Sequence, residues 1–146
     1  MEWILKPKES IGPLKFGMTR KEVHEILGEP NRVFDYTMEK TPCFIDSYKK
    51  KGFNICFKGN FDTNELAHVD ILSGIVVKDE NGNVLFPVCI HRLMSIYPMD
   101  TKEVFNGRDG SSVYKSYRNA VCAIVDDKDL QVIRFTMHRA IKKVKE

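Results

Sequence analysis

The chain has 146 residues, of which 42% are hydrophobic, 23 are basic and 20 are acidic, and its formal net charge at pH 7 is +3. A chain of this size can bury a core as a single domain, 1–146, without disulfide bonds. The charge is too balanced to indicate nucleic acid or an anionic membrane as a partner, and no apolar run is long enough for a signal peptide or a membrane span. We therefore expect one cytoplasmic domain, with no membrane and no direct nucleic-acid contact.

The first predicted element is a helix after Thr19. Thr19 and Glu22 have the spacing of a capping box, and Gly28 and Pro30 are residues that end a helix. The residues at helical spacing that give this helix one apolar face are Val23, Ile26 and Leu27.

Strands are expected next, because short segments with β-type composition or alternation follow the helix at 32–36, 44–46, 53–57 and 66–72. A hairpin then joins 76–77 to 84–86, since Asn81-Gly82 supplies the positive φ angles of a tight turn. Residues 87–97 predict a core helix with Pro87 in its first turn. Residues 99–104 repeat the start of the first helix and predict a short helix that begins at Thr101 and that Asn106-Gly107 ends early. Residues 120–125 and 131–137 read as two more strands.

Two local matches suggest an internal duplication. The pattern Met18 to Val23 returns as Met99 to Val104, and Ser47-Tyr48-Lys49 returns as Ser116-Tyr117-Arg118, in each case before an apolar strand. We expect repeats at 11–73 and 98–138, joined by the hairpin and helix at 76–97. The fold class is therefore α+β: a unit of one helix and an antiparallel β-meander, duplicated within one domain.

The run from Ile11 to Pro30, with the Ser-Tyr step and the strand 52–57, resembles the helix-then-meander unit of the outer-membrane-assembly lipoprotein superfamily. It is most similar to soluble bacterial members that act as immunity proteins beside polymorphic toxins, including contact-dependent growth-inhibition systems. The chain differs from the lipoproteins because it has no signal sequence and no lipidation cysteine. The resemblance implies inhibition of a cognate toxin by tight, stoichiometric binding.

Motifs for catalysis or metal binding are absent from the sequence. The four histidines are far apart, so a metal site would need distant residues to converge. His24 is expected on the polar side of the first helix as a surface residue. His68 and Asp70 point the same way from one strand, and the pair is either an acid/base couple or, more simply, part of a solvated strand face. No glycine-rich phosphate loop or nucleophile elbow occurs. We expect no enzyme, no cofactor and no metal.

The four cysteines, Cys43, Cys56, Cys89 and Cys122, have no Cys-x-x-Cys spacing. Two of them lie in apolar runs, where a thiol behaves as a small buried hydrophobe. We expect free thiols, with a zinc site or a disulfide as the alternatives.

Partner binding would rest on exposed carboxylates and aromatic side chains, because a toxin nuclease presents a basic cleft. Carboxylates of the first half are expected to share an exposed surface, although each cluster is also explained by ordinary turn chemistry. The candidate partner-binding residues are Asp35, Tyr36, Glu39, Asp46, Asp62, Glu65, His68 and Asp70.

Our expectation is an immunity protein that binds and neutralises a cognate bacterial toxin, possibly a nuclease. The first alternative is a non-catalytic scaffolding or peptide-binding module that uses an exposed strand edge. The second is a small enzyme or ligand-binding protein with a deep pocket at His68 and Asp70.

Overall fold

A computed structural model describes residues 1–38, 41–59, 64–104 and 110–141. Within these residues the protein is an α+β fold dominated by antiparallel strands, with two α-helices, α1 (Arg20–Leu27) and α2 (Ile90–Ile96), and a short 3-10 turn, η1 (Lys49–Lys51). The predicted fold class is confirmed at this level, since a helix precedes an antiparallel meander.

An eight-stranded antiparallel sheet forms the centre of the molecule, in the order β10-β11-β12-β13-β7-β6-β5-β4. Its first-half strands are β4 (Arg32–Met38), β5 (Thr41–Tyr48), β6 (Phe53–Lys58) and β7 (Glu65–Ile71). Its second-half strands are β10 (Thr101–Val104), β11 (Ser111–Ser116), β12 (Val121–Asp126) and β13 (Val132–His138). The two meanders join where β7 pairs with β13, so that His68 lies opposite His138.

A smaller sheet has the order β3-β2-β1-β8-β9. Its strands are β1 (Glu2–Lys6), β2 (Ser10–Ile11), β3 (Leu14–Lys15), β8 (Val76–Lys78) and β9 (Val84–Phe86). Strand β1 pairs in parallel with β8, which connects the N-terminus to the predicted hairpin between the two halves. The sequence analysis did not predict these three N-terminal strands, and β2 and β3, with two residues each, are too short to give a sequence pattern.

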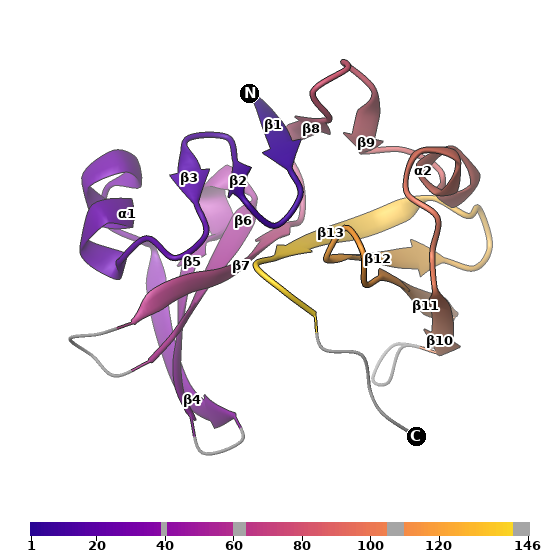
Figure 1. Cartoon of the computed structure of the whole chain (residues 1–146). Helices are drawn as coiled ribbons and strands as arrows, with labels where there is room; N and C mark the ends of the chain where they lie inside the picture. Colours follow the sequence, from indigo (N-terminus) through magenta and orange to yellow (C-terminus); the bar gives the residue numbers. More distant parts are fainter. Residues whose placement is uncertain (39–40, 60–63, 105–109, 142–146) are drawn as a thin grey trace.

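Both helices and the smaller sheet lie on one side of the eight-stranded sheet (Figure 1). Side chains along each strand alternate between the two sides of the sheet. Those of Val69, Phe135 and Met137 point to the covered side and are fully buried. The other side, which we call the open face, carries polar side chains from the same strands, and no helix or strand of the described residues covers it. Its central residues are His68, Asp70, Arg134, Thr136 and His138.

The helix start predicted at Thr101 is wrong. Residues Thr101–Val104 form β10, which pairs in register from Thr101 opposite Lys115 to Val104 opposite Ser112. The backbone finds sheet partners there, and the β-branched Thr101 and Val104 suit a strand. Residues 106–107, which were expected to end this helix, lie outside the described residues.

The succession of one helix and four strands still occurs twice, as α1 with β4–β7 and α2 with β10–β13. Helix α2 begins at Ile90 rather than at Pro87, because Ile90 N–H donates to the carbonyl of Leu130 and Val132 N–H donates to that of Val88. Those bonds tie residues 88–90 to the start of β13. A duplication of the sequence itself stays a prediction.

Candidate functional site

Helix α1 begins with the predicted capping box. Thr19 Oγ1 accepts a hydrogen bond from Glu22 N–H at 3.2 Å, and the Glu22 carboxylate accepts one from Thr19 N–H at 3.3 Å. Val23 is fully buried beneath the helix, whereas Ile26, which was expected on the same apolar face, is 44% exposed. The helix therefore rests on a narrower apolar stripe than the sequence indicated.

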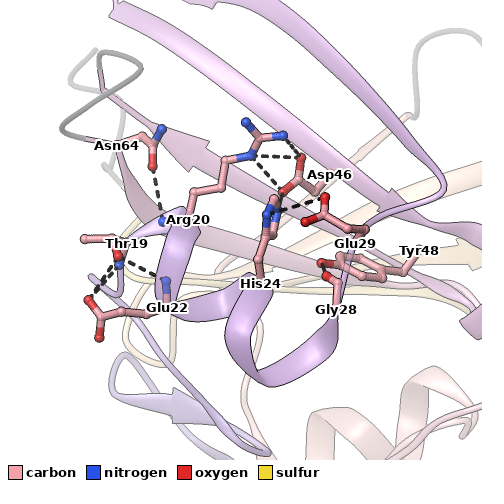
Figure 2. Close-up of polar contacts among 9 residues, drawn as sticks. All are labelled: Thr19, Arg20, Glu22, His24, Gly28, Glu29, Asp46, Tyr48 and Asn64. Atoms are coloured by element: carbon pink, nitrogen blue, oxygen red, sulfur yellow. Dashed lines mark hydrogen bonds and ion pairs between the residues drawn. The ribbon is translucent and has the colours of Figure 1, made fainter.

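A polar cluster fastens α1 to β5 (Figure 2). The carboxylate of Asp46 is completely buried and accepts hydrogen bonds from Arg20 Nε at 2.9 Å and from the Arg20 terminal nitrogen at 2.8 Å. His24 Nε2 lies 2.6 Å from the second oxygen of the same carboxylate. Since an ionised carboxylate only accepts hydrogen bonds, Nε2 is the donor in this contact. One buried carboxylate thus orients two side chains of the helix.

Further hydrogen bonds fix both ends of α1. Arg20 N–H donates to the side-chain oxygen of Asn64 at 3.2 Å, and the Tyr48 hydroxyl donates to the Gly28 carbonyl at 2.7 Å (Figure 2). Burial raises the pKa of Tyr48 to about 12, so this hydroxyl stays protonated and keeps donating at physiological pH. The helix therefore has a defined position over the sheet edge.

The outer side of this cluster is a shallow hollow of about 440 Å³ lined by Arg20, Lys21, His24, Glu25 and Glu29. Glu25 and Glu29 are exposed, and the Glu29 carboxylate lies 3.9 Å from His24 Nδ1. Beyond β5, strand β4 adds the exposed Asp35 and the 51% exposed Val33.

Strand register places Asp35 beside α1. Asp35 lies directly opposite Phe44 in the β4–β5 pair, and the Arg20 guanidinium lies 5.8 Å from the centre of the Phe44 ring. Directly opposed residues of an antiparallel pair share one side of the sheet. Asp35 therefore points to the side that α1 occupies. We call Lys21, Glu25, Glu29, Val33 and Asp35, with Arg20 and His24 beneath, the α1–β4 surface.

The structure separates the predicted partner-binding residues. The expectation that Asp46 and Asp70 are exposed is wrong, because their relative exposures are 0% and 8%. Asp70 is hydrogen-bonded to Arg134 and Thr136 on the open face. Asp35 is exposed on β4, and the exposed Glu65 pairs with Arg139 at 2.6 Å.

The remaining predictions fall elsewhere. Tyr36 lies in β4, but its side chain, like Glu39 and Asp62, is outside the described residues. His68 is half-buried on the open face, in ring contact with His138 at 4.9 Å between centroids. Burial is the main reason that the pKa of His68 is lowered and that the pKa of His138 falls to about 4.

Arg20 and His24 were not among the predicted site residues, and His24 was interpreted as a surface histidine. Its side chain is only 20% exposed. The partner that buries it, Asp46, is 22 positions away in the sequence, so no local spacing could reveal the contact. The signal that did exist was two basic side chains at i and i+4 on the polar side of a capped helix.

Chemically, the cluster holds an imidazole whose Nδ1 faces the hollow and whose Nε2 is oriented by a carboxylate. Such an arrangement can position a hydrogen-bonding group or move a proton. However, the Asp46 carboxylate is also ion-paired with Arg20, so it does not serve His24 alone. No described Ser, Cys or Lys side chain is hydrogen-bonded to His24.

Among the described residues, no group of three or more His, Cys, Asp or Glu side chains lies close enough together to hold a metal ion. The four cysteines are free, as predicted.

Comparisons with known proteins give little further information. No family model matches the chain, and no curated protein matches it. A solved structure with some similarity is the crystal structure of YjgB, a DUF4309 family protein from Bacillus subtilis subsp. subtilis str. 168. It has 13% sequence identity and a TM-score of 0.46 over 84% of this chain and 78% of that one, which is too distant to support an argument. None of the helices within the described residues has the length and apolar character of a membrane span.

Proposed function

We propose that this chain is an immunity protein that neutralises a cognate bacterial toxin by stoichiometric binding, and that the α1–β4 surface is where it binds. The observation that carries the site is the buried Asp46 carboxylate, which fixes Arg20 and His24 beneath a hollow bordered by exposed carboxylates. The immunity role itself rests on the sequence resemblance. In this proposal the protein acts in the cytoplasm, without a cofactor and without catalysis.

Charge favours a basic partner at this surface. Glu25, Glu29 and Asp35 are exposed carboxylates, while the guanidinium of Arg20 is already paired with Asp46. Within the part of the chain that the structure describes, Lys21 is then the one Lys or Arg of this hollow that forms no ion pair. A nuclease toxin presents a cationic cleft to its substrate, and carboxylates arranged opposite such a cleft raise the association rate and fix the orientation of the complex.

Rigidity favours the same surface. Interfaces gain affinity when their side chains are ordered before binding, because less conformational entropy is lost. Hydrogen bonds to Asn64 and Asp46 hold the start and middle of α1, through Arg20 and His24, and the hydrogen bond from the Tyr48 hydroxyl holds its end. The exposed Val33 adds apolar area beside the carboxylates, as the centre of a binding surface requires.

The test is co-expression of this chain with the open reading frame immediately upstream of its gene, with growth rescue and co-purification as readouts. We expect the neighbour to arrest growth alone, and the pair to grow normally and to purify as a stable complex. A harmless neighbour, or a toxic one that this chain neither binds nor neutralises, would contradict the proposal.

A second candidate is peptide binding by strand addition, which the long edge strand β4 favours. Its seven residues pair with β5 on one side, and the other side has no strand partner among the described residues. A bound peptide would extend the sheet through main-chain hydrogen bonds. Hydrogen exchange and one variant distinguish the two candidates. Strand addition should protect the β4 amides from exchange, and Glu25→Lys should leave peptide affinity unchanged. Binding through side chains of the α1–β4 surface should leave the β4 amides unprotected, and Glu25→Lys should weaken it.

A further inference from the structure

A second hollow, of about 520 Å³, is lined by His68 and His138 of the open face, and so lies on the opposite side of the sheet from α1. Strands β5, β6, β7 and β13 and the residues after β13 line it. Its volume is in the range of small-molecule sites, and its lining is mixed, with Ala67, Ala140 and Ile141 as the accessible apolar part. The resemblance and the α1–β4 surface assign no role to it, although Glu65 and His68, which line it, were among the predicted partner-binding residues.

Two imidazoles converge in this hollow. His68 and His138 are directly opposed in the β7–β13 pair, and their ring centroids are 4.9 Å apart. A neutral imidazole has one N–H donor and one acceptor nitrogen. Lys58, exposed at the end of β6, adds an ammonium group to the same lining. The other charged residues there, Glu65 and Arg139, are paired with each other at 2.6 Å.

The charges that face the two rings are mostly positive. Lys58 on β6 and Arg134 on β13 lower the pKa of His68, and Lys58 together with Lys115 on β11 lowers that of His138, in addition to the larger effect of burial. Among these charges Asp70 on β7 has the largest effect and raises the pKa of both rings, and its carboxylate is bound by Arg134 and Thr136. Lys58 is exposed and lines the hollow, so its ammonium group can attract an anion there.

We infer that this hollow binds a small organic acid, whose carboxylate lies between Lys58 and the imidazoles of His68 and His138 and whose apolar body packs on Ala67, Ala140 and Ile141. Two N–H donors and one ammonium group match the lone pairs of a carboxylate. The apolar residues beside them accept the hydrocarbon part of the ligand. This inference does not depend on the toxin-binding proposal, because the two hollows lie on opposite sides of the sheet.

Three probes of equal shape and different charge test it: benzoate, neutral benzamide and cationic benzamidine. Each is titrated into the full chain at pH 7 while the side-chain NMR signals of the histidines are followed. We expect benzoate to shift His68 and His138 saturably, with an affinity at least tenfold above that of benzamide, and benzamidine to bind most weakly. Bound benzoate also raises the pKa of His138 from about 4, because an anion stabilises the imidazolium.

Two variants locate the site. Lys58→Met lowers benzoate affinity about fivefold or more and leaves benzamide binding unchanged, whereas Lys50→Met, at an exposed lysine of η1, changes neither. If Lys58→Met fails to fold, the comparison of the three probes on the unaltered chain still tests the inference. Equal binding of the three probes, shifts confined to His24 or His91, no saturable shift, or saturable binding of Zn²⁺ at His68 and His138 would each overturn the inference.

Discussion

Arg20 and Asp46, 26 positions apart in the sequence, form a two-pronged ion pair in which the carboxylate has no exposure to solvent. His24 uses the same carboxylate, so Asp46 is the acceptor for two side chains of α1. Removing one partner of a buried pair leaves the other charge desolvated and unmatched, which costs more than the pair itself contributes.

We therefore expect Asp46→Ala to lower the free energy of unfolding by about 3 kcal/mol. Urea denaturation followed by circular dichroism measures this. Asp35→Asn is the matched control, because Asp35 is exposed on the adjacent strand and its loss should change stability by less than about 0.5 kcal/mol. Similar effects of the two substitutions would show that Asp46 does not hold α1 in place.

The capping box gives a second prediction. Thr19→Ala removes the acceptor for Glu22 N–H and should destabilise the protein by about 1 kcal/mol. Lys21→Ala, at an exposed position of the same helix turn, should have an effect within about 0.5 kcal/mol. Thermal unfolding of the two variants compares them directly, and a larger loss for Lys21→Ala would count against the cap.

Gly52 and Gly82 allow backbone strain to be separated from steric overlap, since both have positive φ, at 90° and 85°. A Cβ on Gly52 would lie 1.9 Å from the carbonyl oxygen of Ser73, whereas one on Gly82 would meet nothing within 4 Å. We expect Gly82→Ala to cost about 1 kcal/mol from the left-handed backbone alone. Gly52→Ala should cost at least about 2 kcal/mol more, because the backbone at Ser73 must move. If chemical denaturation shows that both substitutions lower the free energy of unfolding equally, the close approach of Gly52 to the Ser73 carbonyl is refuted.

Asp70 makes stability depend on acid pH. Burial raises its pKa, but the hydrogen bonds and charge of Arg134 and the hydrogen bond of Thr136 outweigh burial, and the net shift is downward. A carboxyl whose pKa is lower in the folded state stabilises the protein above its unfolded pKa of about 3.9, and this contribution is lost as pH falls below that value.

The variant Asp70→Asn should therefore be less stable than the unaltered chain at pH 7, and the difference should shrink at pH 3. Denaturation midpoints at the two pH values measure this. A difference that stays constant or grows on acidification would contradict the assigned charge state.

Local sequence patterns predicted many of the elements but missed β1, β2, β3 and β11 and did not show the contacts. The capping box at Thr19, the alternation in 53–57 and the apolar run 120–125 each predicted the observed local structure, and the hairpin around Asn81-Gly82 was also right, although only Gly82 of that pair has a positive φ. The pattern at 99–104 failed, because pairing with β11 outweighed a helix-type start. Such tertiary pairing cannot be read from a six-residue motif.

The candidate sites depend on contacts between distant residues. Asp46 was expected on the surface because carboxylates favour solvent, yet it is buried by two side chains supplied by α1. His68 and His138 are 70 positions apart and meet because the two meanders join at β7 and β13. Neither contact, that of Asp46 with α1 or that of His68 with His138, can be predicted from residue spacing in the sequence.

The central claim, that the α1–β4 surface binds a basic toxin, is tested most directly by measuring the affinity of the co-expressed neighbour for two charge-reversal variants. Glu25→Lys should weaken the complex at least tenfold, because it places a cation opposite the basic cleft. Glu80→Lys, an equal change of charge at an exposed turn far from α1 in the sequence, should leave the affinity unchanged. Equal affinities for the unaltered chain and both variants would contradict the claim.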